Sequence, residues 1–149
     1  MKNFKSNNKA LKELAGHFDK ELQAHLPVTV LPNGVIVYKD FYVKQLSNSN
    51  WGLFRITTKE LINQYFLKSC ALMAAKAYHA INLEKYNEIK QLDNKYWANH
   101  SDSIIFKNNL KLTKDYEKYL VLLTRYEFCE QQAREYKEQI SRMFRWSFV

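Results

Sequence analysis

The hydrophobic residues near the start of the chain recur every three or four positions, which is the spacing of one face of a helix. They are Leu11, Leu14, Phe18, Leu22 and the pair His25/Leu26. Asn8 can cap the first turn, and Pro27 ends the pattern because the residue before a proline avoids the α conformation. The sequence therefore predicts an N-terminal helix within residues 1–26.

Residues 27–57 change from helical spacing to β-branched and aromatic residues at alternating positions. The predicted strands are Val28–Val30, Val35–Val43 with a kink at Lys39–Asp40, and Trp51–Ile56. Pro32–Gly34 and Ser47–Asn50 supply the turns between them. We expect an antiparallel meander of three strands, with a helix covering one face.

Helical spacing returns after residue 57 and continues to the end of the chain. Thr57-x-x-Glu60 matches a capping box and predicts a helix over 58–80, whose broad apolar stripe suits packing on two sides. Asn82 can cap a second helix over 83–99. Ser101–Ser103 is typical of a break, and residues 104–112 fit a short helix or an extended segment.

The last stretch predicts one long helix, which Thr113 caps and which runs to about Phe144. Its seam has the spacing of a coiled coil and consists of Tyr119, Leu123, Tyr126, Cys129/Glu130, Ala133, Tyr136, Ile140 and Met143. A helix of about 30 residues spans about 45 Å, more than the ~26 Å diameter of a 100-residue domain. We expect it to lie antiparallel to 58–80 or 83–99, or to cross into a second subunit. The whole pattern predicts a single α+β domain over 1–149, with a helix in 1–26, a sheet in 27–57 and a helical part in 58–149.

The net charge of +8 suggests an acidic partner such as nucleic acid. The charge is spread evenly, since segments 1–26, 27–57, 58–100 and 101–149 each carry +2, and the excess of Lys over Arg is typical of AT-rich coding sequence. Lys107, Lys111, Lys114 and Lys118 would form one basic stripe if 104–120 were helical. A basic stripe can neutralise phosphates, so these four lysines are the candidate nucleic-acid contact.

The sequence contains no motif for a nucleotide, a metal or a cofactor. Its three glycines, at positions 16, 34 and 52, exclude the Gly-rich phosphate loops and nucleotide binding through them. His17, Glu21 and His25 are spaced for a metal on one helix face but lack a fourth ligand. We therefore expect no metal and no cofactor.

The cysteines and the remaining histidines favour structural roles. Cys70 and Cys129 fall on apolar stripes, which predicts buried thiols. His79 and His100 lie near predicted helix ends, where a cation is favourable. A nucleophilic thiol would require Cys129 to face one of these histidines. We predict that the protein is not an enzyme.

The end of the chain, Arg142–Val149, is strongly aromatic. It can dock on its own sheet, pack on a partner, or touch a membrane interface. No apolar run reaches the ~18 residues of a membrane span, and the first ten residues do not resemble a secretory signal. We therefore expect a soluble, cytoplasmic protein.

The long seam and the aromatic end together favour a non-enzymatic, self-associating binding or assembly module, a homo-oligomer. The candidate oligomer or docking contacts are Tyr119, Leu123, Tyr126, Tyr136, Ile140, Met143, Phe144, Trp146 and Phe148. The alternative is a nucleic-acid-binding accessory protein that uses the basic helix face.

Overall fold

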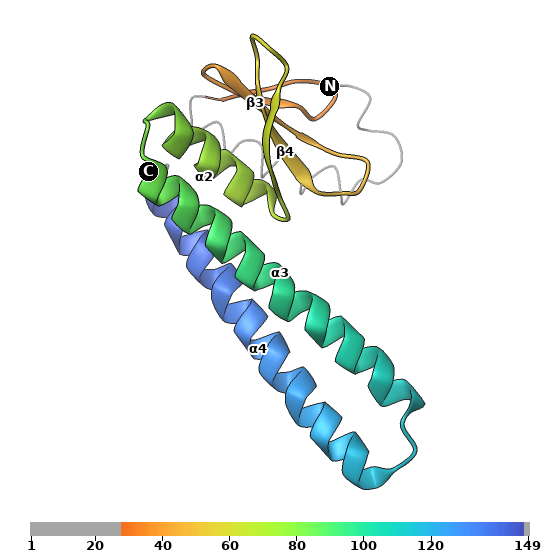
Figure 1. Ribbon diagram of the computed structural model, residues 1–149. Coiled ribbons are helices and arrows are strands. Elements are labelled where there is room, and N and C mark those ends of the chain that lie inside the picture. Colours follow the sequence, from red (N-terminus) through yellow and green to blue (C-terminus); the bar gives the residue numbers. More distant parts are fainter. Residues whose placement is uncertain (1–27, 148–149) are drawn as a thin grey trace.

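The computed structural model describes residues 28–147, which form an antiparallel sheet followed by three helices (Figure 1). The strands are β1 (Thr29–Val30), β2 (Ile36–Tyr38), β3 (Phe41–Gln45), β4 (Trp51–Arg55) and β5 (Leu61–Tyr65). The helices are α2 (Lys68–His79), α3 (Leu83–Leu112) and α4 (Tyr116–Ser147). The α+β class is confirmed. The predicted N-terminal helix falls in residues 1–27, outside the described residues, and the first described element is a strand.

The sheet has five strands in the order β1-β2-β3-β4-β5, so the prediction of three strands was wrong. The expected long strand over Val35–Val43 is two strands joined by a turn at Lys39–Asp40. Lys39 takes φ +52°, as tight hairpin turns require at their first position. Tyr38 pairs with Phe41 across the turn, which keeps both rings on the core face.

The capping-box interpretation of Thr57–Glu60 was also wrong, because this segment turns the chain from β4 into β5. The Thr58 hydroxyl accepts a hydrogen bond from the Glu60 amide at 3.3 Å, and Lys59 takes φ +59°. β5 then pairs with β4. Without β5, the backbone N–H and C=O groups along the free edge of β4 would lack hydrogen-bond partners. The helix that was expected from residue 58 begins at Lys68.

α2 lies between the sheet and the other two helices, which confirms the prediction that this helix packs on two sides. Ala71, Ala74 and Ala75 are fully buried in it, and their small side chains allow neighbouring elements to approach closely. The core forms where α2 meets the inner sheet face and the base of the helices that follow. Its larger members are Ile36, Val43, Leu53, Tyr65, Leu72, Met73, Ile89 and Ile140.

α3 and α4 form a long antiparallel hairpin that projects away from the sheet (Figure 1). α3 has 30 residues and α4 has 32, or about 45 and 48 Å at 1.5 Å per residue. The expected N-cap at Asn82 is confirmed, since its side chain accepts a hydrogen bond from the Lys85 amide. The long C-terminal helix pairs with α3, one of the arrangements that its seam allowed.

The expected break at Ser101–Ser103 was wrong, and residues 104–112 are helical. The Ser103 hydroxyl donates to the His100 carbonyl at 2.7 Å, so this serine bonds within the helix instead of ending it. The chain leaves α3 at Leu112. Asp115, and not Thr113, caps α4, because its carboxylate accepts hydrogen bonds from the Glu117 and Lys118 amides at 3.0 and 3.2 Å.

Candidate functional site

The base of the hairpin contains a buried carboxylate, Asp93 of α3, which is fully enclosed. It accepts a hydrogen bond from the Phe66 amide at 2.8 Å and another from the Leu67 amide at 3.0 Å. Leu67 is the N-cap residue of α2 and has no side-chain oxygen to offer. Asp93 therefore caps α2 from another helix and places a negative charge at its N-terminus, where the helix dipole favours it.

Three further polar groups surround Asp93. Lys90 donates to the Gln64 carbonyl and places its ammonium 4.8 Å from the centre of the Tyr65 ring. Burial lowers the pKa of Lys90. Burial also raises the pKa of Asp93, although the two amide hydrogen bonds act in the opposite direction and lower it. Burial, reinforced by Asp93, holds the pKa of the Cys70 thiol far above its usual range. A thiol kept protonated in an enclosed site is a poor nucleophile. The hydrogen bonds of Asp93 and Lys90 connect α3 to β5 and to the start of α2, and we call this cluster the joint.

The histidines and Cys129 do not assemble around this joint. His79 ends α2, as expected, and its ring lies edge-on to Tyr38 at 6.0 Å. His100 lies in the middle of α3 and not near a helix end, because α3 runs on to Leu112. It stacks on Tyr96 with ring centres 5.6 Å apart. Cys129 is half-buried, and burial raises its pKa.

No group of three metal-ligating side chains occurs within residues 28–147. The His17, Glu21 and His25 set lies outside the described residues. Over the same range, no helix combines the length and the apolar character needed to cross a membrane.

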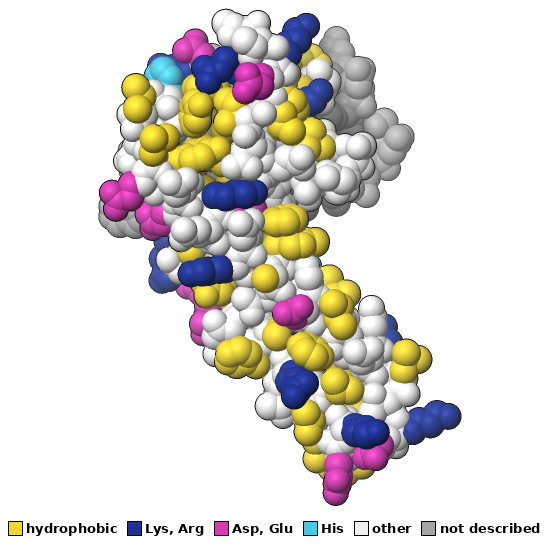
Figure 2. Space-filling model, viewed as in Figure 1, with side chains coloured by type: hydrophobic (Ala, Val, Ile, Leu, Met, Phe, Trp, Pro, Cys, Tyr) yellow, Lys and Arg dark blue, Asp and Glu magenta, His cyan; other side chains and the backbone are white. Residues whose placement is uncertain are grey.

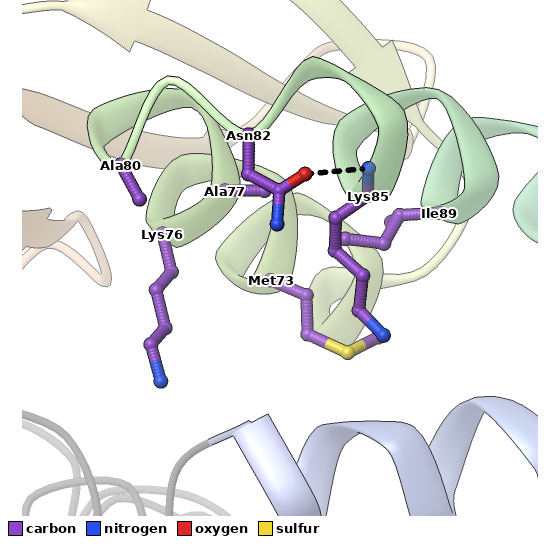
Figure 3. A pocket seen from close by; sticks show the side chains of 7 residues that line it. All are labelled: Met73, Lys76, Ala77, Ala80, Asn82, Lys85 and Ile89. Carbon is purple, nitrogen blue, oxygen red and sulfur yellow. Dashed lines mark hydrogen bonds between the residues drawn. The ribbon is translucent and has the colours of Figure 1, made fainter.

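A hollow of about 320 Å³ lies beside the joint, where α2 turns into α3 (Figure 3). Its lining is mainly apolar and comprises Met73, Lys76, Ala77, Ala80, Asn82, Lys85 and Ile89. The Asn82 oxygen points to the Lys85 amide, where it forms the helix cap, as Figure 3 shows. The described lining offers no carboxylate, thiol or imidazole for acid–base or nucleophilic work.

The seam of α4 divides into two parts. Near the base, Ile140 is buried, and Tyr136, Met143 and Phe144 pack against the same core. These four candidate docking contacts therefore touch their own chain. Towards the tip, Leu123 and Tyr126 are only half-buried and Tyr119 is 38% exposed. Trp146 lies in α4, but its side chain and all of Phe148 are outside the described residues.

The outer half of the hairpin exposes large apolar side chains, which Figure 2 shows between Lys and Arg side chains along its length. On α3 they are Ile104, Ile105 and Leu112, and on α4 they are Tyr116, Tyr119, Leu120, Val121 and Phe128. Trp97 of α3, nearer the base, is 40% exposed and stacks on the Phe66 ring with centres 4.7 Å apart. Leu112 is 79% exposed, Tyr116 73% and Phe128 62%. Two antiparallel helices have only one mutual seam, so the remaining apolar positions are left facing outward.

A second hollow, of about 330 Å³, marks one side of this outer half. It is lined by His100, Ser103, Ile104 and Lys107 of α3 and by Tyr126 and Glu130 of α4. Residues seven positions apart lie on the same side of a helix. On α3, Trp97 therefore lies on the same side as Ile104. On α4, Tyr116 and Leu123 lie on the same side as Glu130. Leu120 is one turn from Tyr116 and extends the same side. We call the set Trp97, Ile104, Tyr116, Leu120 and Leu123 the hairpin face.

The four candidate lysines lie around the tip of the hairpin and not along one helix. Lys107 and Lys111 belong to α3, Lys114 to the connection at 113–115, and Lys118 to α4. The break at 113–115 therefore overturns the single straight stripe that a helix over 104–120 would give. All four are exposed, and Asp115 and Glu117 lie among them.

No family model, no curated protein and no solved structure matches the chain.

The exposed apolar residues of α3 were missed in the sequence because the predicted break at Ser101–Ser103 hid the length of the helix. A usable signal was present. Ile105 and Leu112 are seven residues apart, as are Val121 and Phe128, and a seven-residue spacing on both helices indicates a second apolar side.

Proposed function

We propose that the protein is a non-enzymatic assembly module that associates with itself through the hairpin face. The observation that supports this most directly is the exposure of Ile104, Tyr116 and Leu120 on one side of the hairpin. Contiguous apolar patches of this kind mark interaction sites on soluble proteins. Two hairpins that pack face to face form a four-helix bundle, the usual arrangement for burying a second apolar side.

The charges along the hairpin face favour a second copy of the chain as the partner. Glu127 is seven residues from Leu120 and lies on the same side, nearer the base. Lys107 and Lys111 lie nearer the tip. A copy placed antiparallel by a two-fold axis would therefore put lysines of one hairpin opposite Glu127 of the other. This self-complementarity is what a two-fold interface requires.

Sedimentation velocity over a range of concentrations tests the proposal. We expect a dimer for the unaltered chain. The double variant Ile104→Glu/Leu120→Glu should be a monomer at the same concentration, because four carboxylates would be buried in the interface without partners. Leu83→Glu is the matched control, since Leu83 is 56% exposed at the other end of α3, and it should leave the dimer intact. A monomer for the unaltered chain at the highest concentration would contradict the proposal.

A second candidate, a nucleic-acid-binding accessory protein, is favoured by the exposure of all four lysines at the hairpin tip. Phosphate contacts of this kind weaken steeply as salt rises. Binding to single- and double-stranded DNA at low salt should be detectable, and Lys111→Glu/Lys114→Glu should abolish it. Binding that is absent, or unchanged in this variant, would exclude the candidate.

A further inference from the structure

A row of apolar side chains crosses the sheet on the face turned away from α2. Phe41 and Val43 are buried on the inner face, and Phe41 lies 5.4 Å from the Tyr78 ring of α2, so Tyr42 between them points to the outer face. The strand register then places four outer residues directly opposite one another, from β2 to β5. They are Val37, Tyr42, Phe54 and Leu61, which we call the outer row.

The outer row is packed but uncovered by the described helices. The Tyr42 and Phe54 rings stack at 4.9 Å with 5° between their planes. The absence of a side chain at Gly52 lets Phe54, Leu46 and Leu61 pack over its backbone, since a Cβ there would lie 2.6 Å from a Phe54 ring atom and 3.1 Å from both leucines. Leu61 is 41% exposed. The described helices pack on the other face, so an apolar strip about 14 Å wide, three strand spacings, faces outward.

We propose that residues 9–26 of the same chain cover the outer row with their apolar stripe. The connection to the sheet limits where these residues can lie. Thr29 of β1 pairs with Val37 at one end of the outer row. Only Pro27 and Val28 separate Thr29 from Leu26, so Leu26 lies within about 11 Å of Thr29, which is one strand spacing from Val37. A segment tied this closely has a high effective concentration at the row, which favours it over a separate molecule.

The size and charge of the segment match the row. As a helix, the stripe from Leu11 to Leu26 is about 22 Å long, enough to cover a row of about 14 Å. At 100° per residue, Asp19 and Glu21 fall on the two borders of this stripe, Lys12 falls beside Asp19, and Lys20 falls on the opposite side. The outer face carries Lys44, whose ammonium lies 5.2 Å from the Phe54 ring centre. The border at Glu21 carries an acid and no cation, so it is the one that can face Lys44 of the sheet.

Photo-crosslinking of the full chain tests this inference independently of self-association. Tyr42 is replaced by p-benzoylphenylalanine, the purified protein is irradiated, and the adduct is mapped by mass spectrometry. We expect a crosslink within one chain to residues 9–26. The same probe in place of Phe128, on the hairpin, is the control and should give no adduct with these residues. An adduct of dimer size, an adduct elsewhere, or none would overturn the inference.

A pair of substitutions in the segment adds a second test. Phe18→Asp places a charge in the apolar stripe and should lower the yield of the position-42 adduct at least tenfold. Lys20→Asp makes the opposite side acidic and should leave the yield near its original value. Circular dichroism melting of both variants checks that the sheet and the helices remain folded. An unchanged yield in folded Phe18→Asp protein would overturn the inference.

Discussion

Asp93 and Leu67 are joined by a hydrogen bond of 3.0 Å between a carboxylate of α3 and the amide of the N-cap residue of α2. The same carboxylate reaches the Phe66 amide at 2.8 Å, so both of its oxygens are occupied at the start of α2. α2 is the layer that covers the sheet, and α3 is one arm of the hairpin. The two hydrogen bonds therefore tie the base of the hairpin to the segment that joins β5 to α2.

Replacing Asp93 should destabilise the protein strongly. Asp93→Ala leaves two buried amides without acceptors, and we expect the free energy of unfolding to fall by about 3 kcal/mol. Urea denaturation measures this difference. Asp102→Ala removes an exposed acid from the same helix and should change the free energy by less than about 0.5 kcal/mol. Similar values for the two variants would show that the carboxylate does not cap α2.

Stability should decline at alkaline pH. Folding raises the pKa of Cys70 and of Tyr65, mainly through burial, so the native state keeps protons that the unfolded chain releases. The stabilisation from the two raised pKa values is fully present below pH 9.0, the ordinary pKa of the thiol, and is lost as the pH rises further. Cys70→Ala should make the decline shallower by up to about 1.4 kcal/mol per pH unit. Denaturation at several pH values measures the slopes, and Cys129→Ala, which removes a thiol that is only half-buried, should change the slope less than Cys70→Ala does.

The two thiols should differ in chemical reactivity. Cys70 is fully buried, while Cys129 is only half-buried on α4. In the folded protein, iodoacetamide at pH 8 should modify Cys129 and leave Cys70 intact, as mass spectrometry of the digested protein would show. Both should react in urea. Rapid labelling of Cys70 in the native state would mean that the joint opens readily in the folded protein.

The two glycines of the sheet region should respond differently to alanine. Gly34 takes φ +85° in open space, so Gly34→Ala carries only the conformational cost of about 1–2 kcal/mol. At Gly52 the new methyl group would meet Phe54, Leu46 and Leu61, and we expect Gly52→Ala to cost about 1–3 kcal/mol through displaced side chains. The Gly52 variant should also change the environment of Tyr42, visible in near-ultraviolet circular dichroism, and the Gly34 variant should not.

Helix pairing was predictable from the sequence because it depends on repeated spacing. The seam from Leu123 to Met143 has the periodicity of a packed helix, and its buried members Ala133 and Ile140 lie where that spacing places them. The buried Cys70 and the cap at Asn82 followed from equally local patterns. The seam did not reveal its partner, since helices 58–80 and 83–99 offered similar apolar faces.

The errors arose where distant contacts decide between two local signals. Thr57-x-x-Glu60 suits a helix start, but pairing of β5 with β4 outweighs that preference. Tyr38 and Phe41 are both buried although they are three positions apart, because the turn at Lys39–Asp40 interrupts the alternation of inward and outward residues. No local pattern could show that Asp93, an acid on an otherwise apolar helical face, caps a helix that begins 25 residues earlier in the chain.

The strand order β1-β2-β3-β4-β5 has a consequence for how the chain acquires its structure. Every strand pairs with its neighbour in sequence, and α3 pairs with the helix that follows it directly. The loops that must close are therefore short, and low contact order of this kind goes with fast folding. The sheet can form by successive hairpins and the long helices by zipping from the turn at 113–115, and the packing of the base of α4 on α2 and the core then joins segments that are far apart in the chain.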